Sequence, residues 1–126
     1  MRSANSLVAL ALAAGLAAPL PVAAQTVKLL VQSSPLAGFR HHEAALVWQE
    51  LGVGDRLALV REPDNPYDAN AVRVEWAGRK LGYVPRTENA ALAWAMDRGE
   101  RVSARISRLT QHPNSRKRIE FEVFVE

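Results

Sequence analysis

The sequence predicts an α+β fold that is mostly β: a compact six-stranded antiparallel barrel of OB/SH3-like type, with one clear helix and one short helix. Six short segments alternate apolar and polar residues and are separated by turn-forming residues, as half-buried strands do. One segment, Glu88–Arg98, has the apolar spacing of an amphipathic helix. The chain has 126 residues, room for one domain. Antiparallel strands in so short a chain close most easily into a small barrel.

The first 24 residues are predicted to be a secretory signal peptide, which leaves residues 25–126 as the domain. Arg2 gives a positive start, Leu7–Leu20 is apolar, and Val22-Ala23-Ala24 is typical of a signal-peptidase site. The apolar run is short for a membrane span, which needs about 20 residues. We therefore expect cleavage after Ala24 and an exported protein, periplasmic or secreted; the alternative is an uncut anchor helix.

The first half of the domain is expected to contain two strands and a short helical segment. Val27–Gln32 is predicted to be the first strand, ended by Ser33-Ser34-Pro35, and Leu36–His42 a loop. Glu43–Glu50 can form a short helix or turn, and Asp55–Arg61 is the second strand. The residues of this half expected in the core are Leu46, Val47, Leu51, Leu57 and Leu59.

The middle of the chain is predicted to be a loop, a hairpin and the clear helix. The outgoing strand places Val72, Val74 and Trp76 on one face, and Lys80–Val84 is the returning strand. Thr87 is the expected N-cap of the helix, and Gly99 its C-terminal stop. The buried helix stripe is predicted to contain Ala91, Leu92, Ala95 and Met96.

Two further strands complete the barrel, Arg101–Leu109 and Ile119–Val125, joined by a polar turn. Phe124 lies among outward-facing glutamates and can either stack on a ligand or pack against the helix. The formal net charge of +3 is too small to indicate nucleic acid by itself. Cysteine is absent, which excludes disulfides, thiol nucleophiles and cysteine-based zinc sites. No cofactor and no metal site is expected, since only three histidines are available.

The run R-E-P-D-N-P-Y-D-A-N-A-V-R-V at residues 61–74, followed by K-L-G-Y-V-P-R at residues 80–86, resembles the HIRAN domain family. The resemblance implies a compact barrel with helices beside it. It also implies a domain that binds single-stranded DNA and captures a free 3′ end. Zinc binding and nucleotide hydrolysis in larger members would belong to neighbouring domains.

The resemblance assigns three possible contacts to the loop before the hairpin. Asp68 would accept a hydrogen bond from a terminal 3′-hydroxyl and repel a continuing phosphate. Tyr67 would stack on the last base, and Asn65 would bond the terminal nucleotide. The alternatives are structural: an Asx-turn at Asp68, a ring covering the barrel end at Tyr67, and turn stabilisation by Asn65.

The other implied contacts flank this loop. Arg40 would bind a phosphate through its planar guanidinium, and His41 stands where the family carries a stacking aromatic residue. Arg86 precedes the helix, whose N-terminus favours an anion. Tyr83 would contact a phosphate or be a buried tyrosine.

We therefore expect a non-catalytic module, a monomer that binds single-stranded nucleic acid, with the 3′-hydroxyl end as the candidate point of recognition. The alternative is an exported binding or interaction module for another anionic ligand or a protein, with the DNA role lost. An enzyme is not expected, because no Ser/His/Asp or His/Cys arrangement is evident. Asp64 and Asp68 could hold a divalent ion with Asn65, but turn chemistry explains these residues equally well.

Overall fold

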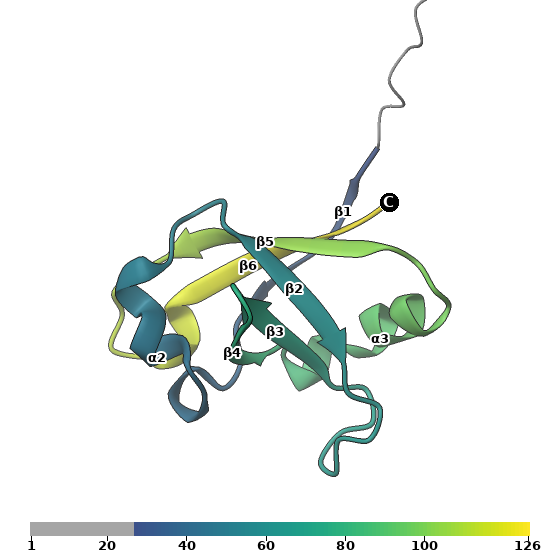
Figure 1. Ribbon diagram of the computed structural model, residues 1–126, viewed down its shortest axis with the longest axis horizontal. Coiled ribbons are helices and arrows are strands. Elements are labelled where there is room, and N and C mark those ends of the chain that lie inside the picture. The colour runs from purple at the N-terminus through teal and green to yellow at the C-terminus, as the bar shows by residue number, and fades with distance from the viewer. Residues whose placement is uncertain (1–26) are drawn as a thin grey trace, which may run out of the picture.

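The computed structural model describes residues 27–126, and the predicted signal peptide lies outside them. The described part is a six-stranded antiparallel sheet with two short α-helices, so the predicted mostly-β fold is confirmed (Figure 1). The sheet order is β1-β6-β5-β2-β3-β4. In chain order the elements are β1 (Leu29–Pro35), α2 (Ala44–Val47), β2 (Arg56–Arg61), β3 (Val72–Trp76), β4 (Arg79–Tyr83), α3 (Ala90–Asp97), β5 (Val102–Leu109) and β6 (Ile119–Val125). Four 3-10 turns lie between them: η1 (Phe39–His41), η2 (Trp48–Glu50), η3 (Arg86–Glu88) and η4 (Ser115–Lys117).

The two ends of the sheet, β1 and β4, are joined by a short backbone bridge. Just beyond β1, the N–H of Ala37 donates to the carbonyl of Tyr83, and the N–H of Tyr83 donates to the carbonyl of Ala37, both at 2.9 Å. The neighbouring Leu36 still donates to Ile119 of β6, also at 2.9 Å. One segment thus leaves β6 and reaches β4 within two residues, and this bridge closes the sheet into a barrel.

Gly82 makes this closure possible. A Cβ atom at position 82 would lie 2.2 Å from the carbonyl oxygen of Ala37, closer than two such atoms can approach. The absence of a side chain therefore allows β4 and the segment after β1 to come into backbone contact.

The hydrophobic core is filled by aliphatic side chains and two phenylalanines, Phe39 and Phe121, most of them nearly inaccessible to solvent. Removing this apolar surface from water is the main source of the stability of the fold. The largest fully buried side chains are Phe121, Leu36, Leu81, Ile106, Ile119, Val47, Val72, Val74, Val84 and Val123. None of the helices within residues 27–126 has the length and apolar composition needed to cross a bilayer.

The strand β1 is longer at its C-terminal end than the sequence predicts. It runs through Ser33-Ser34-Pro35 instead of ending at Gln32. The buried Ser34 hydroxyl accepts a hydrogen bond from Gln32 Nε2 at 2.7 Å and lies 3.4 Å from Glu88 Oε1. Because the polar atoms of these side chains have hydrogen-bond partners, Ser34 can be buried within strand β1.

The clear helix begins later than predicted. Thr87 is not its N-cap: Arg86–Glu88 forms the 3-10 turn η3, and α3 starts at Ala90. The helix ends at Asp97 with Arg98 as its C-cap, and Gly99, the expected stop, follows with a φ of 86°. Its buried face includes Leu92, Ala93 and Ala95, whereas Ala91, predicted to be buried, is exposed.

Leu46 was also predicted for the core and is 75% exposed. The short helix α2 buries only Ala44 and Val47, because four residues cannot turn a third apolar side chain toward the same face. Leu57 is buried as expected, and Leu59 packs against the edge of the core.

Candidate functional site

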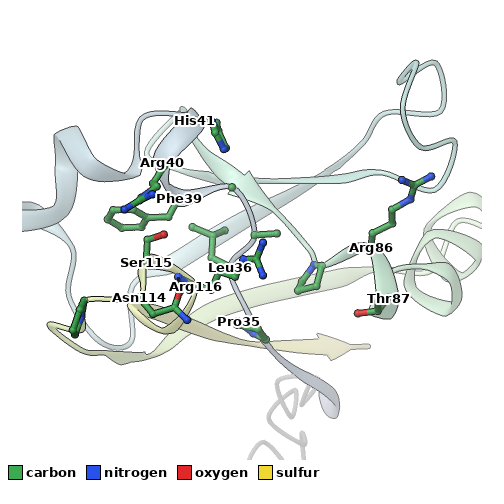
Figure 2. Close-up of a pocket in the computed structure, with 14 residues that line it drawn as sticks. Pro35, Leu36, Phe39, Arg40, His41, Arg86, Thr87, Asn114, Ser115 and Arg116 are labelled. Atoms are coloured by element: carbon green, nitrogen blue, oxygen red, sulfur yellow. Dashed lines mark hydrogen bonds between the residues drawn. The ribbon is translucent and has the colours of Figure 1, made fainter.

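An open groove lies at the end of the barrel where β1 finishes (Figure 2). It has a volume of about 660 Å³. Four segments that are far apart in the sequence form its walls: the end of β1 with the bridge, η1, the turn η3, and the loop containing η4. Its lining residues are Pro35, Leu36, Ala37, Gly38, Phe39, Arg40, His41, Pro85, Arg86, Thr87, Pro113, Asn114, Ser115 and Arg116.

Three arginines line this groove, and no aspartate or glutamate does. In the described residues, Arg40 and Arg116 have no carboxylate within ion-pairing distance. Arg86 reaches only Asp68, at 4.0 Å between Nε and Oδ2. Seven other arginines are paired with acidic residues: Arg61, Arg73, Arg79, Arg98, Arg101, Arg105 and Arg108. The positive charge of this domain is therefore paired over much of the surface, whereas two of the three groove arginines, Arg40 and Arg116, have no carboxylate partner among the described residues.

The loop between β2 and β3, which contains the D-N-P-Y-D motif, is held in shape by internal hydrogen bonds. The Asn65 Oδ1 atom accepts from the backbone N–H of Tyr67 at 2.9 Å and of Asp68 at 3.2 Å. Its Nδ2 donates to Glu62 Oε1 at 2.9 Å. Arg61 ties the same loop to helix α3 by donating to Asp97 Oδ1 at 2.9 Å. The predicted turn-stabilising function of Asn65 is thus present in the structure.

Asp68 links this loop to the start of α3. Its Oδ1 accepts from the N–H of Asn70 at 2.9 Å, the predicted Asx-turn, and its Oδ2 accepts from Nδ2 of the buried Asn89 at 2.7 Å. Partial burial alone raises the pKa of the Asp68 carboxyl. The hydrogen bonds from Asn70 and Asn89 and the nearby charges of Arg86 and Arg61 outweigh that effect and hold the pKa below its usual value. Asp68 is therefore ionised at neutral pH.

Tyr67 and His41 both present exposed rings. Tyr67 is 83% exposed and so does not cover the barrel end, which was the structural alternative for this residue. His41 lies in η1 beside Arg40, on the rim of the groove (Figure 2). Neither ring is buried against other side chains, so both could stack on a ligand.

Tyr83 is half-buried and committed to contacts within the protein. Its hydroxyl donates to Glu62 Oε1 at 2.8 Å. Its ring meets the His42 ring edge-on, with centroids 5.4 Å apart, and Lys80 Nζ lies 4.6 Å from the ring centroid. Tyr83 does not line the groove, so the buried-tyrosine interpretation fits this structure better than a phosphate contact.

The groove contains residues that the sequence did not single out. Asn114, Ser115 and Arg116 form one wall, although their segment was interpreted as a polar turn in a basic part of the chain and none of the three was proposed as a ligand contact. Asn114 Oδ1 accepts from the N–H of Arg116 at 3.0 Å and starts η4. The one available signal was the run Ser115-Arg116-Lys117-Arg118, which contains no acidic residue.

Metal chemistry has little basis in the described part of the chain. Within residues 27–126, no group of three or more histidine or acidic side chains is gathered as a metal site would require. Asn65 and Asp68, two members of the possible divalent-ion site, direct their side chains at protein donors instead.

Comparison with known proteins gives matches to sequence families and to solved structures. The family model described as "HIRAN domain" matches residues 29–126. Two curated relatives are helicase-like transcription factors from Oryctolagus cuniculus, 48% identical over 44 residues, and Mus musculus, 46% identical over 44 residues. Each match covers 34% of this chain and 4% of the relative, so the chain spans only a small part of those proteins.

Two solved structures share the fold. A protein from Lactobacillus plantarum has a TM-score of 0.69 and 27% identity, over 79% of this chain and 95% of that chain. The HIRAN domain of human HLTF has a TM-score of 0.54 and 22% identity, over 78% of this chain and 73% of that chain. At 22% identity, the similarity to the HIRAN domain of human HLTF shows a shared fold.

Proposed function

The chain belongs to the HIRAN domain family, and from that premise we propose that it is a non-catalytic module that binds single-stranded nucleic acid. The groove would hold the strand, and Asp68 would lie at its 3′-hydroxyl end. The observation that carries the proposal is the uncompensated charge of Arg40 and Arg116 in an open groove that has no acidic lining.

The groove suits a phosphate backbone for a physical reason. A guanidinium group offers a planar fork of N–H donors that matches two phosphate oxygens, and an arginine without a carboxylate partner gives up no ion pair when it binds. Arg40 and Arg116 line different walls, so they would contact the backbone of a bound strand from two sides. The exposed Tyr67 ring supplies a stacking surface that accepts any base.

End recognition rests on the charge of Asp68. An ionised carboxylate can accept a hydrogen bond from a terminal hydroxyl, whereas a phosphate in the same place would be repelled. Arg86, with its Nε 4.0 Å from Asp68 Oδ2, lines the groove and would bind the phosphate that precedes the terminal nucleotide. The hydrogen bond from Asn89 keeps the carboxylate in place but leaves oxygen lone pairs for a ligand.

The test is fluorescence-anisotropy binding of the purified protein to two labelled strands of about ten nucleotides, the length that one small barrel can cover. One strand ends in a 3′-hydroxyl and the other in a 3′-phosphate. The variant is Asp68→Asn. Asp64→Asn is the matched control, because Asp64 is an exposed carboxylate in the same loop.

We expect the unmodified protein to prefer the hydroxyl end, and Asp68→Asn to lose that preference while Asp64→Asn keeps it. Equal binding of both strands would reject end recognition and leave a single-strand binder. Failure to bind either strand at low salt would reject the nucleic-acid function. In that case the groove would serve another anionic ligand or a protein.

A further inference from the structure

A second cluster of cations lies on the outside of the barrel, remote from the groove. Lys28, Arg56 and Arg105 surround a shallow hollow of about 330 Å³, together with the ring of Phe124. We call this set of four residues the distal patch. They come from the adjacent strands β6, β5 and β2 and from the residue before β1, which is the next strand of the sheet.

Strand register places these side chains on the same face of the sheet. Arg56 of β2 lies directly opposite Arg105 of β5. Phe124 of β6 lies opposite Ser103 of β5 on one side and Leu30 of β1 on the other. Residues two apart on a strand share a face, which brings Arg105 beside Ser103 and Lys28 beside Leu30. The distal patch therefore extends across the sheet, and it is bordered by Glu126, whose Oε1 lies 3.8 Å from Lys28 Nζ.

The pairing of Arg56 with Arg105 is unfavourable in the free protein. Like charges directly opposite each other on neighbouring strands destabilise a sheet. Glu122 compensates Arg105, with Oε1 at 3.1 Å from Nε. In the described residues, Arg56 has no carboxylate within ion-pairing distance. Its neighbour Asp55 is occupied by other donors, accepting from the N–H of Gly52 at 2.8 Å and from Trp76 Nε1 at 3.0 Å.

Phe124 orients one of the two guanidinium groups. The Cζ atom of Arg105 lies 4.9 Å from the centroid of the Phe124 ring, a cation–π contact. The sequence predicts two alternative roles for Phe124, stacking on a ligand or packing against the helix. In the structure its ring instead contacts Arg105. The contact holds the Arg105 guanidinium at the edge of the hollow, where it and Arg56 could bind the same anion.

We propose that the distal patch is a second phosphate-binding site, and that it binds the same nucleic-acid strand whose 3′ portion occupies the groove. This inference rests on the proposed function. Pro35 lines the groove and Lys28 the distal patch. Pro35 lies seven positions after Lys28 along β1, about 23 Å at about 3.3 Å per residue. That length corresponds to about seven phosphates at the stacked spacing of about 3.4 Å.

The test compares two labelled strands in anisotropy titrations at several salt concentrations. A strand of about four nucleotides is too short to reach both sites, and one of about twenty can span them. The variant is Arg56→Gln, and Arg98→Gln is the control, since Arg98 is an exposed arginine outside both sites. Arg56→Gln should leave the melting temperature unchanged or higher, because it removes the repulsion with Arg105.

We expect Arg56→Gln to weaken binding of the long strand about three- to fivefold, as for one exposed charge contact. The salt slope for the long strand should fall by about 0.7. The short strand and Arg98→Gln should show neither change. An equal loss for both strands would overturn the proposal, because Arg56 would then act at the groove. Unchanged binding of the long strand would overturn it too.

A second measurement separates the distal patch from the proposed function. Inorganic pyrophosphate is titrated into the isotopically labelled protein, and the backbone amide resonances of Arg56 and Arg105 are followed by NMR. Shifts that Arg56→Gln abolishes would support an anion site at the patch, even if neither strand bound and the proposed function failed. The absence of such shifts would overturn the site itself.

Discussion

Replacing Asn89 by alanine should destabilise the protein by about 2 kcal/mol at neutral pH. The buried Asn89 side chain donates to the ionised Asp68 at 2.7 Å. A hydrogen bond to a charged group contributes about 1.5–3 kcal/mol. Asn89 makes no side-chain capping bond to α3, so alanine removes only the link to Asp68 and its packing. For a domain of this size, the loss corresponds to a fall of about 10 °C in melting temperature.

The cost of this substitution should depend on pH in a defined direction. The folded-state pKa of Asp68 lies below its ordinary value, so its contribution to stability is present above the unfolded pKa of about 3.9. That contribution is lost as the pH falls through the lower, folded pKa. The penalty for Asn89→Ala is therefore largest above about pH 5. In acid it should shrink toward about 1 kcal/mol, the value of a neutral hydrogen bond.

The assay is a double-mutant cycle by urea denaturation of the unmodified protein, Asn89→Ala, Asp68→Ala and the double variant, at neutral and acidic pH. The coupling free energy isolates the pair from effects that each residue has separately. A coupling below about 0.5 kcal/mol at neutral pH would refute the reasoning, because it lies under the range for a charged hydrogen bond. A coupling free energy that is larger at acidic pH than at neutral pH would refute the predicted direction of the pH dependence.

Three other substitutions test the barrel closure and the groove. Gly82→Ala should cost several kcal/mol in unfolding free energy measured by denaturation, since its Cβ would lie 2.2 Å from the Ala37 carbonyl; a stable Gly82→Ala protein would contradict the closure described here. Tyr67→Ala should weaken single-strand binding by about 1–3 kcal/mol without changing the melting temperature, because the ring is 83% exposed; equal losses of stability and binding would contradict this. Arg116→Gln should weaken binding to all strand sequences alike and lower the salt slope by about 0.7, and a loss confined to one sequence would argue for base contacts instead.

Strands were predictable where alternation is strict and hydrogen bonding is regular. Val72 and Val74 are fully buried, as the pattern indicates, and the bounds of β6 match the prediction at both ends. The errors fall where tertiary contacts override local preference. Ser34 belongs to β1 because its hydroxyl finds partners within the fold. Thr87 looks like a cap, but the Asn89 side chain of the true N-cap position binds Asp68 instead.

The site was predictable only where its contacts join residues that are close in the sequence. The contacts that Asn65 and Asp68 make within their own loop follow from short-range turn chemistry, which a contiguous motif displays. The wall containing Arg116 could not be found in this way, because Arg116 and Arg40 are far apart in the sequence and line the same groove only in the folded chain. Basic residues are frequent in this chain, and nothing in the sequence marks which of them lack a carboxylate.

The bridge between Ala37 and Tyr83 has a thermodynamic consequence for finding the ligand. It connects residues 46 positions apart, and the groove walls come from both sides of that connection. An unfolded chain therefore has no groove, and any groove ligand binds the native state alone. Such a ligand raises the unfolding free energy by RT ln(1 + [L]/Kd), about 2.7 kcal/mol at a hundredfold excess over Kd. Melting temperatures recorded across a panel of unlabelled oligonucleotides and small anions would therefore rank candidate ligands directly.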